Sequence, residues 1–140
     1  MKLLRWGAAG DERPGVLDEN GRIRDLSGHI PDVRGECLDP ERLRRLAAID
    51  PATLPLVEGS PRLGPPVSGI GKILGIGLNY RSHAEETGAT PGSEPLVFSK
   101  AITALSGPND PVVIPRNSAK TDWEVELAVI IGLRTRYVDE

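Results

Sequence analysis

The sequence predicts an α+β protein in which a small β-rich domain, residues 1–67, precedes a second domain, residues 68–140. Three observations lead to this prediction. Short apolar runs separated by turn residues fill the first part of the chain, five prolines interrupt residues 51–71, and longer apolar runs at strand spacing follow. A chain of 140 residues has room for one moderate core, or for a small domain and part of a larger one.

The first domain is expected to open with a β-hairpin and to continue with one short helix. Asn20-Gly21 lies between two apolar runs, and both residues tolerate the positive φ angles of tight hairpin turns. Further along, Asp39 suits the N-cap of a helix, Pro40 suits its first position, and apolar residues then recur at helical spacing. The prolines of residues 51–71 forbid long regular elements, so we expect an extended connector there.

The second domain is expected to contain several strands and one short helix. Glycine-punctuated apolar residues, 72–78, predict a buried strand, and residues 79–86 predict a helix that Gly88 can terminate. The final apolar stretch is expected to be covered on both faces. Further strands are expected at residues 94–100, 112–114 and 121–133.

Two glutamates in the last predicted strand form a candidate metal site. Apolar and acidic side chains alternate along residues 122–131, so Glu124 and Glu126 point to the same side with Cα atoms about 6.5–7 Å apart. Carboxylates that converge in this way suit Mg²⁺, Mn²⁺ or Ca²⁺, which prefer hard oxygen ligands. The alternative is an edge strand with an acidic face toward solvent, and the pattern alone favours it because Glu-x-Glu is a common tripeptide.

His83 and Glu86 form a candidate acid–base pair, because side chains three residues apart on a helix can meet. A carboxylate that holds one ring nitrogen makes the other nitrogen a better general base. The alternative is a solvated pair on an exposed helix. The position directly after a predicted strand argues against that alternative, because strand ends often present functional side chains. The Gly75-x-Gly77 sequence of that strand lacks the third glycine of a dinucleotide-binding fingerprint.

Composition argues against several classes of function. The net charge is -3, with no cluster of basic residues and few aromatic ones, so nucleic acid is not expected as a partner. No segment has the character of a signal peptide or a membrane span, so we expect a cytoplasmic protein that does not act on membranes. Cys37 is the only cysteine, which leaves no internal disulfide, and no zinc-site spacing is present.

Four blocks of the sequence, in their order and spacing, resemble successive motifs of the fumarylacetoacetate hydrolase family. They are residues 77–86 (GLNYRSHAEE), 95–100 (PLVFSK), 107–110 (GPND) and 121–127 (TDWEVEL). The N-terminal domain is similar to the small leading domain of bacterial members. The strongest similarity is to bacterial proteins labelled ureidoglycolate lyases or 2-hydroxyhepta-2,4-diene-1,7-dioate isomerases.

The resemblance implies a fold and residue roles. The second domain would be the first part of the family's mixed β-roll. Glu124 and Glu126 match the family's metal-binding Glu-x-Glu, with Mg²⁺, Mn²⁺ or Ca²⁺ as the ion, and His83 with Glu86 match its water- or proton-handling dyad. The family's third metal ligand is an aspartate that would lie beyond the last residue of this sequence, as would the rest of the roll.

The resemblance also implies a reaction. We expect a divalent-metal-dependent enzyme acting on a small 2-oxo- or 2-hydroxycarboxylate that lies near Lys100 and Arg81. This would be a ureidoglycolate lyase-like enzyme or a C–C bond hydrolase. The alternatives are a 2-oxoacid decarboxylase or isomerase, of the hydroxyheptadienedioate isomerase or acylpyruvase type, and an inactive truncated remnant. We further expect a homodimer at full length, and aggregation when the 140-residue fragment is expressed alone.

Overall fold

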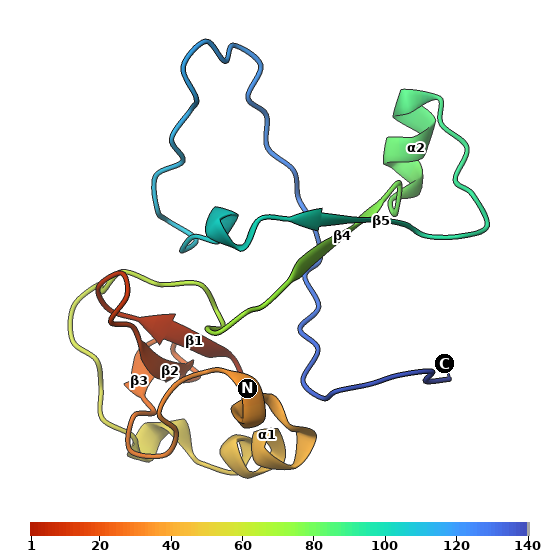
Figure 1. Cartoon of the computed structure of the whole chain (residues 1–140). Helices are drawn as coiled ribbons and strands as arrows, with labels where there is room; N and C mark the ends of the chain where they lie inside the picture. The colour runs from red at the N-terminus through yellow and green to blue at the C-terminus, as the bar shows by residue number, and fades with distance from the viewer. Residues whose placement is uncertain (140) are drawn as a thin grey trace. The chain divides into compact units, whose positions relative to one another are not determined.

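The structure, a computed structural model, describes residues 1–139, and these residues form two units (Figure 1). The first unit consists of residues 1–69 together with the segment from Ser106 onward, and the second consists of residues 70–105. Each unit is described by itself. The mixture of short helices and two sheets confirms the α+β class, whereas the mixed β-roll stays a prediction.

The first unit is built on a three-stranded antiparallel sheet of strands β1 (Leu3–Trp6), β2 (Arg13–Leu17) and β3 (Ile23–Asp25), in that order. The predicted hairpin is the β2–β3 pair, and Gly21 in its turn has a φ of 73°. The connector is extended, as predicted, and forms single bridges to the sheet at Leu56 and Leu63. It therefore completes the edges of the sheet.

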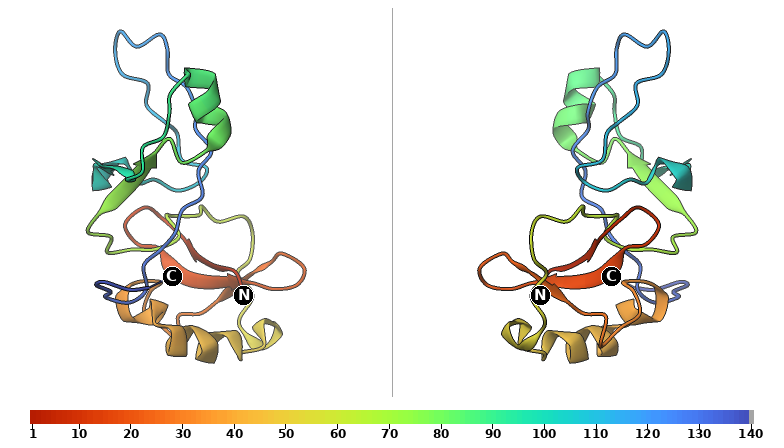
Figure 2. Two further views of the ribbon diagram at one scale, coloured as in Figure 1. Left: turned by 90° about the vertical axis from the view of Figure 1, so that its right-hand side faces the viewer. Right: turned by 90° about the vertical axis from the view of Figure 1, so that its left-hand side faces the viewer.

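Helix α1 (Pro40–Ala47) forms a second layer against this sheet (Figure 2). Its N-terminus follows the sequence prediction, since the Asp39 carboxylate accepts hydrogen bonds from two backbone N–H groups of the first turn and Pro40 occupies the first position. Short 3-10 helices, η1 (Gly35–Leu38) and η2 (Pro51–Thr53), flank α1. The buried side chains between the two layers include Val16, Leu26, Leu46 and Leu54.

The second unit is a two-stranded antiparallel sheet with one helix. Strands β4 (Ile73–Gly77) and β5 (Leu96–Lys100) pair in full register, and helix α2 (Arg81–Thr87) follows β4. Gly88 ends the helix in the left-handed conformation with a φ of 65°, as predicted. A short 3-10 helix, η3 (Ile102–Ala104), follows β5.

Two strand predictions are wrong for the described structure. Residues 112–114 and 121–133 contain no strand, and Figure 1 shows this part of the chain as an open trace. A strand requires ladder hydrogen bonds to a neighbour, and no described strand pairs with either segment. The alternating sequence supplies the side-chain pattern of a strand without supplying its partner.

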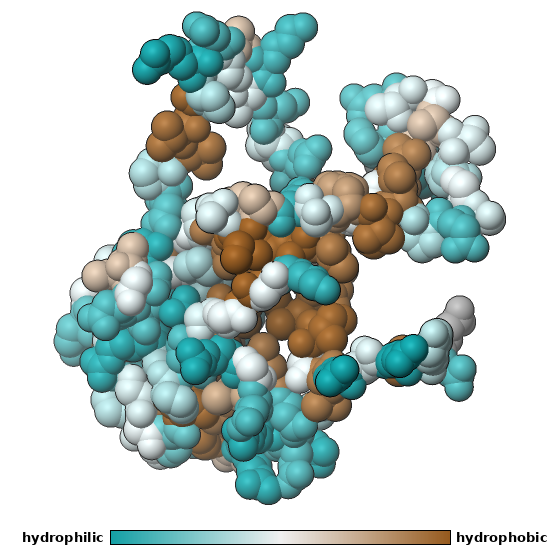
Figure 3. Space-filling view, in the orientation of Figure 1, coloured by the Kyte–Doolittle hydropathy of each residue, from teal (hydrophilic) through white to brown (hydrophobic). Residues whose placement is uncertain are grey.

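Large apolar side chains consequently lie at the surface, where they appear brown in Figure 3. Many belong to residues 112–114 and 123–133, and others to β4 and β5. The expected coverage of the last apolar stretch on both faces is therefore absent from the described residues. Among these residues, no helix is long and apolar enough to cross a membrane.

Candidate functional site

Helix α2 carries three of the predicted site residues. Between β4 and α2 the chain turns at Leu78, whose φ of 54° is a left-handed conformation that side chains rarely adopt. Arg81 begins the helix, and His83 and Glu86 lie one turn apart, both exposed. Among the described contacts none joins the His83 ring to the Glu86 carboxylate, so the helix places the predicted dyad within reach without forming it.

Lys100 is the last residue of β5 in the same unit. Its ammonium group lies 5.8 Å from the centroid of the Phe98 ring, close enough for a cation–π contact. The side chain is exposed, as are those of the rest of β5. This arrangement leaves a positive charge at the end of the strand, where the sequence predicted it.

A hollow of about 270 Å³ lies at the end of β4 in this unit. Its wall includes the Leu78 turn, the polar side chain of Asn79, and the loop of residues 91–96 with Ser93 and Glu94. None of the six predicted site residues lines it. It is small enough to suit a compact ligand.

Glu124 and Glu126 lie in the first unit, in the segment that forms no strand. Both are exposed, and Glu124 makes contacts within the protein. Within residues 1–139, no group of three or more histidine, cysteine, aspartate or glutamate side chains is arranged to hold a metal ion. The second unit thus contains four of the predicted site residues, and the first unit contains the other two, Glu124 and Glu126. The four are Arg81, His83, Glu86 and Lys100.

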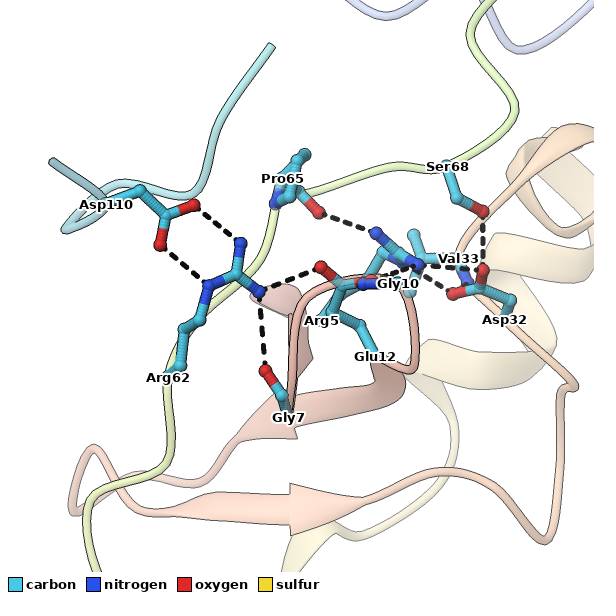
Figure 4. Close-up of polar contacts among 10 residues, drawn as sticks. All are labelled: Arg5, Gly7, Gly10, Glu12, Asp32, Val33, Arg62, Pro65, Ser68 and Asp110. Atoms are coloured by element: carbon cyan, nitrogen blue, oxygen red, sulfur yellow. Dashed lines mark hydrogen bonds and ion pairs between the residues drawn. The ribbon is translucent and has the colours of Figure 1, made fainter. Parts of the chain in front are cut away.

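A chain of partly buried ion pairs that the sequence did not predict occupies the first unit (Figure 4). Arg5 is at its centre. Its Nε donates to Asp32 Oδ1 at 2.7 Å and its Nη2 donates to Asp32 Oδ2 at 3.2 Å and to Glu12 Oε2 at 3.3 Å. The Asp32 carboxylate also accepts the Ser68 hydroxyl. This chain links strand β1 to two loops and to the connector.

Arg62 continues the ion-pair chain toward the C-terminal segment. Its Nη1 donates to Glu12 Oε1 at 2.8 Å, and its Nε and Nη2 donate to the two oxygens of Asp110 at 2.7 and 2.6 Å. Asp110 also accepts the backbone N–H of Gly107 at 2.7 Å. These two residues bound the GPND block, so in this structure that block fastens the chain to the connector.

The ion pairs shift the pKa values of their carboxyl groups. The Arg62 guanidinium lowers the pKa of both Glu12 and Asp110. Burial alone would raise the pKa of Asp32, but hydrogen bonds from Arg5, Ser68 and its own neighbour outweigh burial and lower it. The carboxylate of Asp110, which has the larger effect, and that of Glu12 in turn raise the pKa of Arg62. All of these groups are therefore held in their charged forms.

Asp18 forms a separate polar cluster in the β2–β3 turn. Its carboxylate accepts the backbone N–H groups of Asn20 and Arg22, each at 2.9 Å, and the guanidinium groups of Arg22 and Arg24 at 3.0 and 2.9 Å. Burial opposes ionisation, but these hydrogen bonds together lower the pKa of Asp18 to about 2. This cluster stabilises the hairpin turn. It is formed by residues 18–24 and contains none of the predicted site residues.

A groove of about 500 Å³ lies between the sheet and α1 in the first unit. Apolar side chains, such as Leu17, Leu26 and Leu46, form most of its wall, and Lys2 and Glu19 lie at its polar margin. No predicted site residue lines this groove either. All of the residues that line it lie between Met1 and Leu54.

Comparison with known proteins places the second half of the chain in a family. Residues 72–140 match the family described as fumarylacetoacetate (FAA) hydrolase C-terminal. Over all 140 residues the chain is 58% identical to a Burkholderia ambifaria protein named "Putative hydrolase", 58% to one from Burkholderia cenocepacia and 56% to one from Burkholderia multivorans. The chain covers 50% of each of these relatives, so it spans about half their length.

Proposed function

Residues 72–140 belong to the fumarylacetoacetate hydrolase family, and on this basis we propose that the chain carries part of the active centre of a divalent-metal-dependent enzyme acting on a small 2-oxo- or 2-hydroxycarboxylate. The observation that supports the proposal is the family match itself. It spans the candidate base, His83, the candidate cation, Lys100, and both candidate metal ligands, Glu124 and Glu126. The hydrolase names of the relatives agree with it.

The donor chemistry of Glu124 and Glu126 fits a hard divalent cation, because carboxylate oxygens are the ligands that Mg²⁺, Mn²⁺ and Ca²⁺ prefer. Two carboxylates do not complete a site, and the described residues offer no third ligand beside them. The proposal therefore requires further ligands for the ion, from water, from the substrate or from another part of the protein. When bound, such an ion would polarise the substrate's carbonyl or hydroxyl oxygen and stabilise negative charge that develops there.

His83 is proposed to move the proton. Its ring is exposed on a helix of the second unit, so it is free to meet a substrate or a water molecule. The Glu86 carboxylate, one turn away, can hold the ring by one nitrogen and leave the other to act as the base. The proton would come from water in a C–C hydrolase, from the substrate hydroxyl in a ureidoglycolate lyase, or from carbon in an isomerase.

Lys100 and Arg81 are proposed to bind the substrate's carboxylate. Both are cationic and exposed, at the end of β5 and at the start of α2 respectively. An arginine can bind a carboxylate with two parallel hydrogen bonds, and a lysine acts as a point charge. This pair would select acids over neutral substrates.

A covalent chimera tests the proposal. Residues 1–140 are joined to the remaining half of the Burkholderia ambifaria relative, and the product is assayed against ureidoglycolate, oxaloacetate and an acylpyruvate after chelation and after addition of Mg²⁺ or Mn²⁺. We expect turnover of at least one substrate that depends on the ion. The substrate that reacts distinguishes the lyase and hydrolase from the decarboxylase, and no turnover on any substrate would support an inactive remnant.

Variants within the 140 residues show whether the activity uses this chain's side chains. Glu124→Gln should weaken Mn²⁺ binding, measured by titration, and His83→Asn should leave that binding unchanged while lowering kcat by about 100-fold or more. Glu85→Gln removes an exposed carboxylate from the same helix and serves as the matched control. Full turnover by Glu124→Gln in excess chelator would contradict the metal proposal.

A further inference from the structure

The turn between β2 and β3 exposes a pair of residues that can react with each other. Asn20-Gly21 is the only Asn-Gly pair in the sequence, and both residues are exposed to water. Asparagine is a thermolabile residue, because its side-chain carbonyl carbon can be attacked by the backbone nitrogen of the residue that follows. Glycine in the following position has no side chain to hinder that approach. The turn therefore brings together the groups that an intramolecular reaction needs.

We propose that Asn20 is a self-modification site, at which the side-chain amide becomes a carboxylate when the β2–β3 turn opens. The backbone nitrogen of Gly21 bonds to the side-chain carbonyl carbon of Asn20, and the bond from that carbon to the amide nitrogen breaks. The proton of the Gly21 nitrogen leaves with the amide group as ammonia, and a cyclic succinimide remains. Water then opens the ring at either carbonyl and gives aspartate or isoaspartate. No metal ion or substrate takes part, so the inference goes beyond the proposed function.

The closed turn restrains the attacking nitrogen. The Gly21 N–H donates to the Asp18 carbonyl oxygen at 3.0 Å, and the Asn20 N–H donates to Asp18 Oδ1 at 2.9 Å. The first hydrogen bond directs the Gly21 nitrogen toward Asp18 and keeps on it the proton that it must lose to react. A backbone hydrogen bond of ordinary strength slows such a reaction by about fivefold. The folded turn is therefore the protected state of the site.

The Asp18 carboxylate determines how firmly the turn is closed. It accepts the backbone N–H of Arg22 at 2.9 Å and the guanidinium groups of Arg22 and Arg24 at 3.0 and 2.9 Å. These contacts join the end of β2 to the start of β3, and they must loosen before Gly21 can turn toward the Asn20 side chain. Removal of the carboxylate should therefore speed the reaction without changing either reacting residue.

The isoaspartate product is incompatible with the present turn. It routes the backbone through the side-chain carbon, which adds one carbon to the chain between residues 20 and 21. The length of a hairpin turn fixes the register of its strands, and in the present register Leu17 lies opposite Ile23. The modification should consequently weaken this end of the β2–β3 pair.

Asn117 provides a comparison within the same chain. It is exposed, and the N–H of the following residue, Ser118, donates to the Pro115 carbonyl oxygen at 3.1 Å, so it also lies in a closed turn. The side chain of Ser118 crowds its backbone nitrogen, whereas Gly21 has no side chain. When both turns are open, Asn20 should therefore react faster than Asn117.

Incubation of the 140-residue chain in mildly alkaline buffer, with and without urea that unfolds it, tests the proposal. Mass spectrometry of the peptides that carry Asn20 and Asn117 measures the loss of each amide. Labelling with an isoaspartyl methyltransferase measures the isoaspartate that forms. We expect Asn20 to react at least about fivefold faster in urea than in buffer, because urea removes the hydrogen bond that restrains the Gly21 nitrogen.

Substitutions in the turn show whether Asp18 controls the reaction. Asp18→Ala should raise the rate at Asn20 in buffer by about fivefold or more and leave the rate in urea unchanged. Asp18→Ser keeps a small oxygen acceptor for the backbone N–H groups, so it should give a smaller increase and serves if the alanine variant does not fold. Glu19→Ala removes the neighbouring exposed carboxylate of the same turn and is the matched control, with no change expected in either rate.

Four results would overturn the proposal. Equal rates at Asn20 in buffer and in urea would mean that the turn gives no protection. An unmodified Asn20 in urea, or a faster reaction at Asn117 there, would mean that the Asn-Gly pair is not the modification site. A folded Asp18→Ala variant that reacts in buffer no faster than the original chain would mean that Asp18 does not control the reaction.

Discussion

Replacing Arg5 with methionine should destabilise the first unit more than replacing any other single member of its ion pairs. The side chain of Arg5 is 9% exposed, and its guanidinium is shared between Asp32 and Glu12, whose side chains are 18% and 7% exposed. Methionine keeps much of the volume of the arginine but donates no hydrogen bond. Two partly buried carboxylates therefore lose a positive neighbour at once.

The expected loss is about 3 kcal/mol. Removing one partner of a buried ion pair typically costs about 3–5 kcal/mol, because the remaining charge is left without compensation. The lower end applies to Arg5, since Glu12 keeps its hydrogen bond from Arg62 and Asp32 keeps those from the Ser68 hydroxyl and the Val33 backbone N–H. With a urea m-value of about 1.5 kcal/mol per M, the midpoint should fall by about 2 M.

Urea unfolding followed by Trp6 fluorescence measures this change, because Trp6 directly follows Arg5 in β1. A Trp123→Phe background removes the other tryptophan. The control is Arg45→Met, which breaks the exposed Arg45–Glu41 pair on α1 and should change the midpoint little. If Arg5→Met shifted the midpoint no more than Arg45→Met, the ion-pair chain would contribute nothing and the reasoning would be refuted.

Three further predictions concern the same unit. The folded pKa of Asp18 is about 2, below its ordinary value of 3.8, so its contribution to stability is present above about pH 4 and is lost as the pH falls toward 2. The Asp18→Asn variant should therefore lose less stability than the original protein when the pH is lowered from about 4 to about 2. Gly107→Ala should be destabilising in thermal unfolding, because a Cβ there would collide with the Leu63 carbonyl oxygen, whereas Gly28→Ala meets nothing and should be tolerated. Asp39→Ala should cost about 1 kcal/mol in urea unfolding by removing the N-cap of α1, and an unchanged midpoint would contradict the role of that cap.

Elements with strong local signals were predictable from the sequence. The Asn20-Gly21 turn, the Asp39 cap and the Gly88 terminator each act within a few residues of their own position, so the hairpin and both helices follow from short stretches of sequence. The pairing of residues 96–100 with β4 was compatible with the apolar runs but not specified by them. Register depends on a partner strand that a local pattern does not identify.

The last strand prediction failed for the same physical reason. Residues 121–133 alternate as a strand does, yet a strand exists only when another backbone donates to it and accepts from it. The convergence of Glu124 and Glu126 was argued from strand geometry, so it requires the same backbone pairing that the local pattern does not supply.

The ion-pair chain was missed because its members are far apart in the sequence. Arg5 and Asp32 are 27 residues apart, and Arg62 and Asp110 are 48 residues apart, so no motif or spacing joins them. The GPND block did contain Asp110, but a resemblance read from that block says nothing about its arginine partner. Only the folded connector brings the charges together.

The positions of these contacts along the chain give the ion pairs a further role in the architecture. The chain leaves the first unit just after Ser68, which donates to Asp32, and it returns at Gly107, whose N–H donates to the Arg62 partner, Asp110. The point at which the chain leaves the first unit and the point at which it returns are therefore held by one continuous series of polar contacts within that unit. This series stabilises the first unit where the connector and the C-terminal segment come together, because removing any one of its charges leaves a neighbouring charge without its partner.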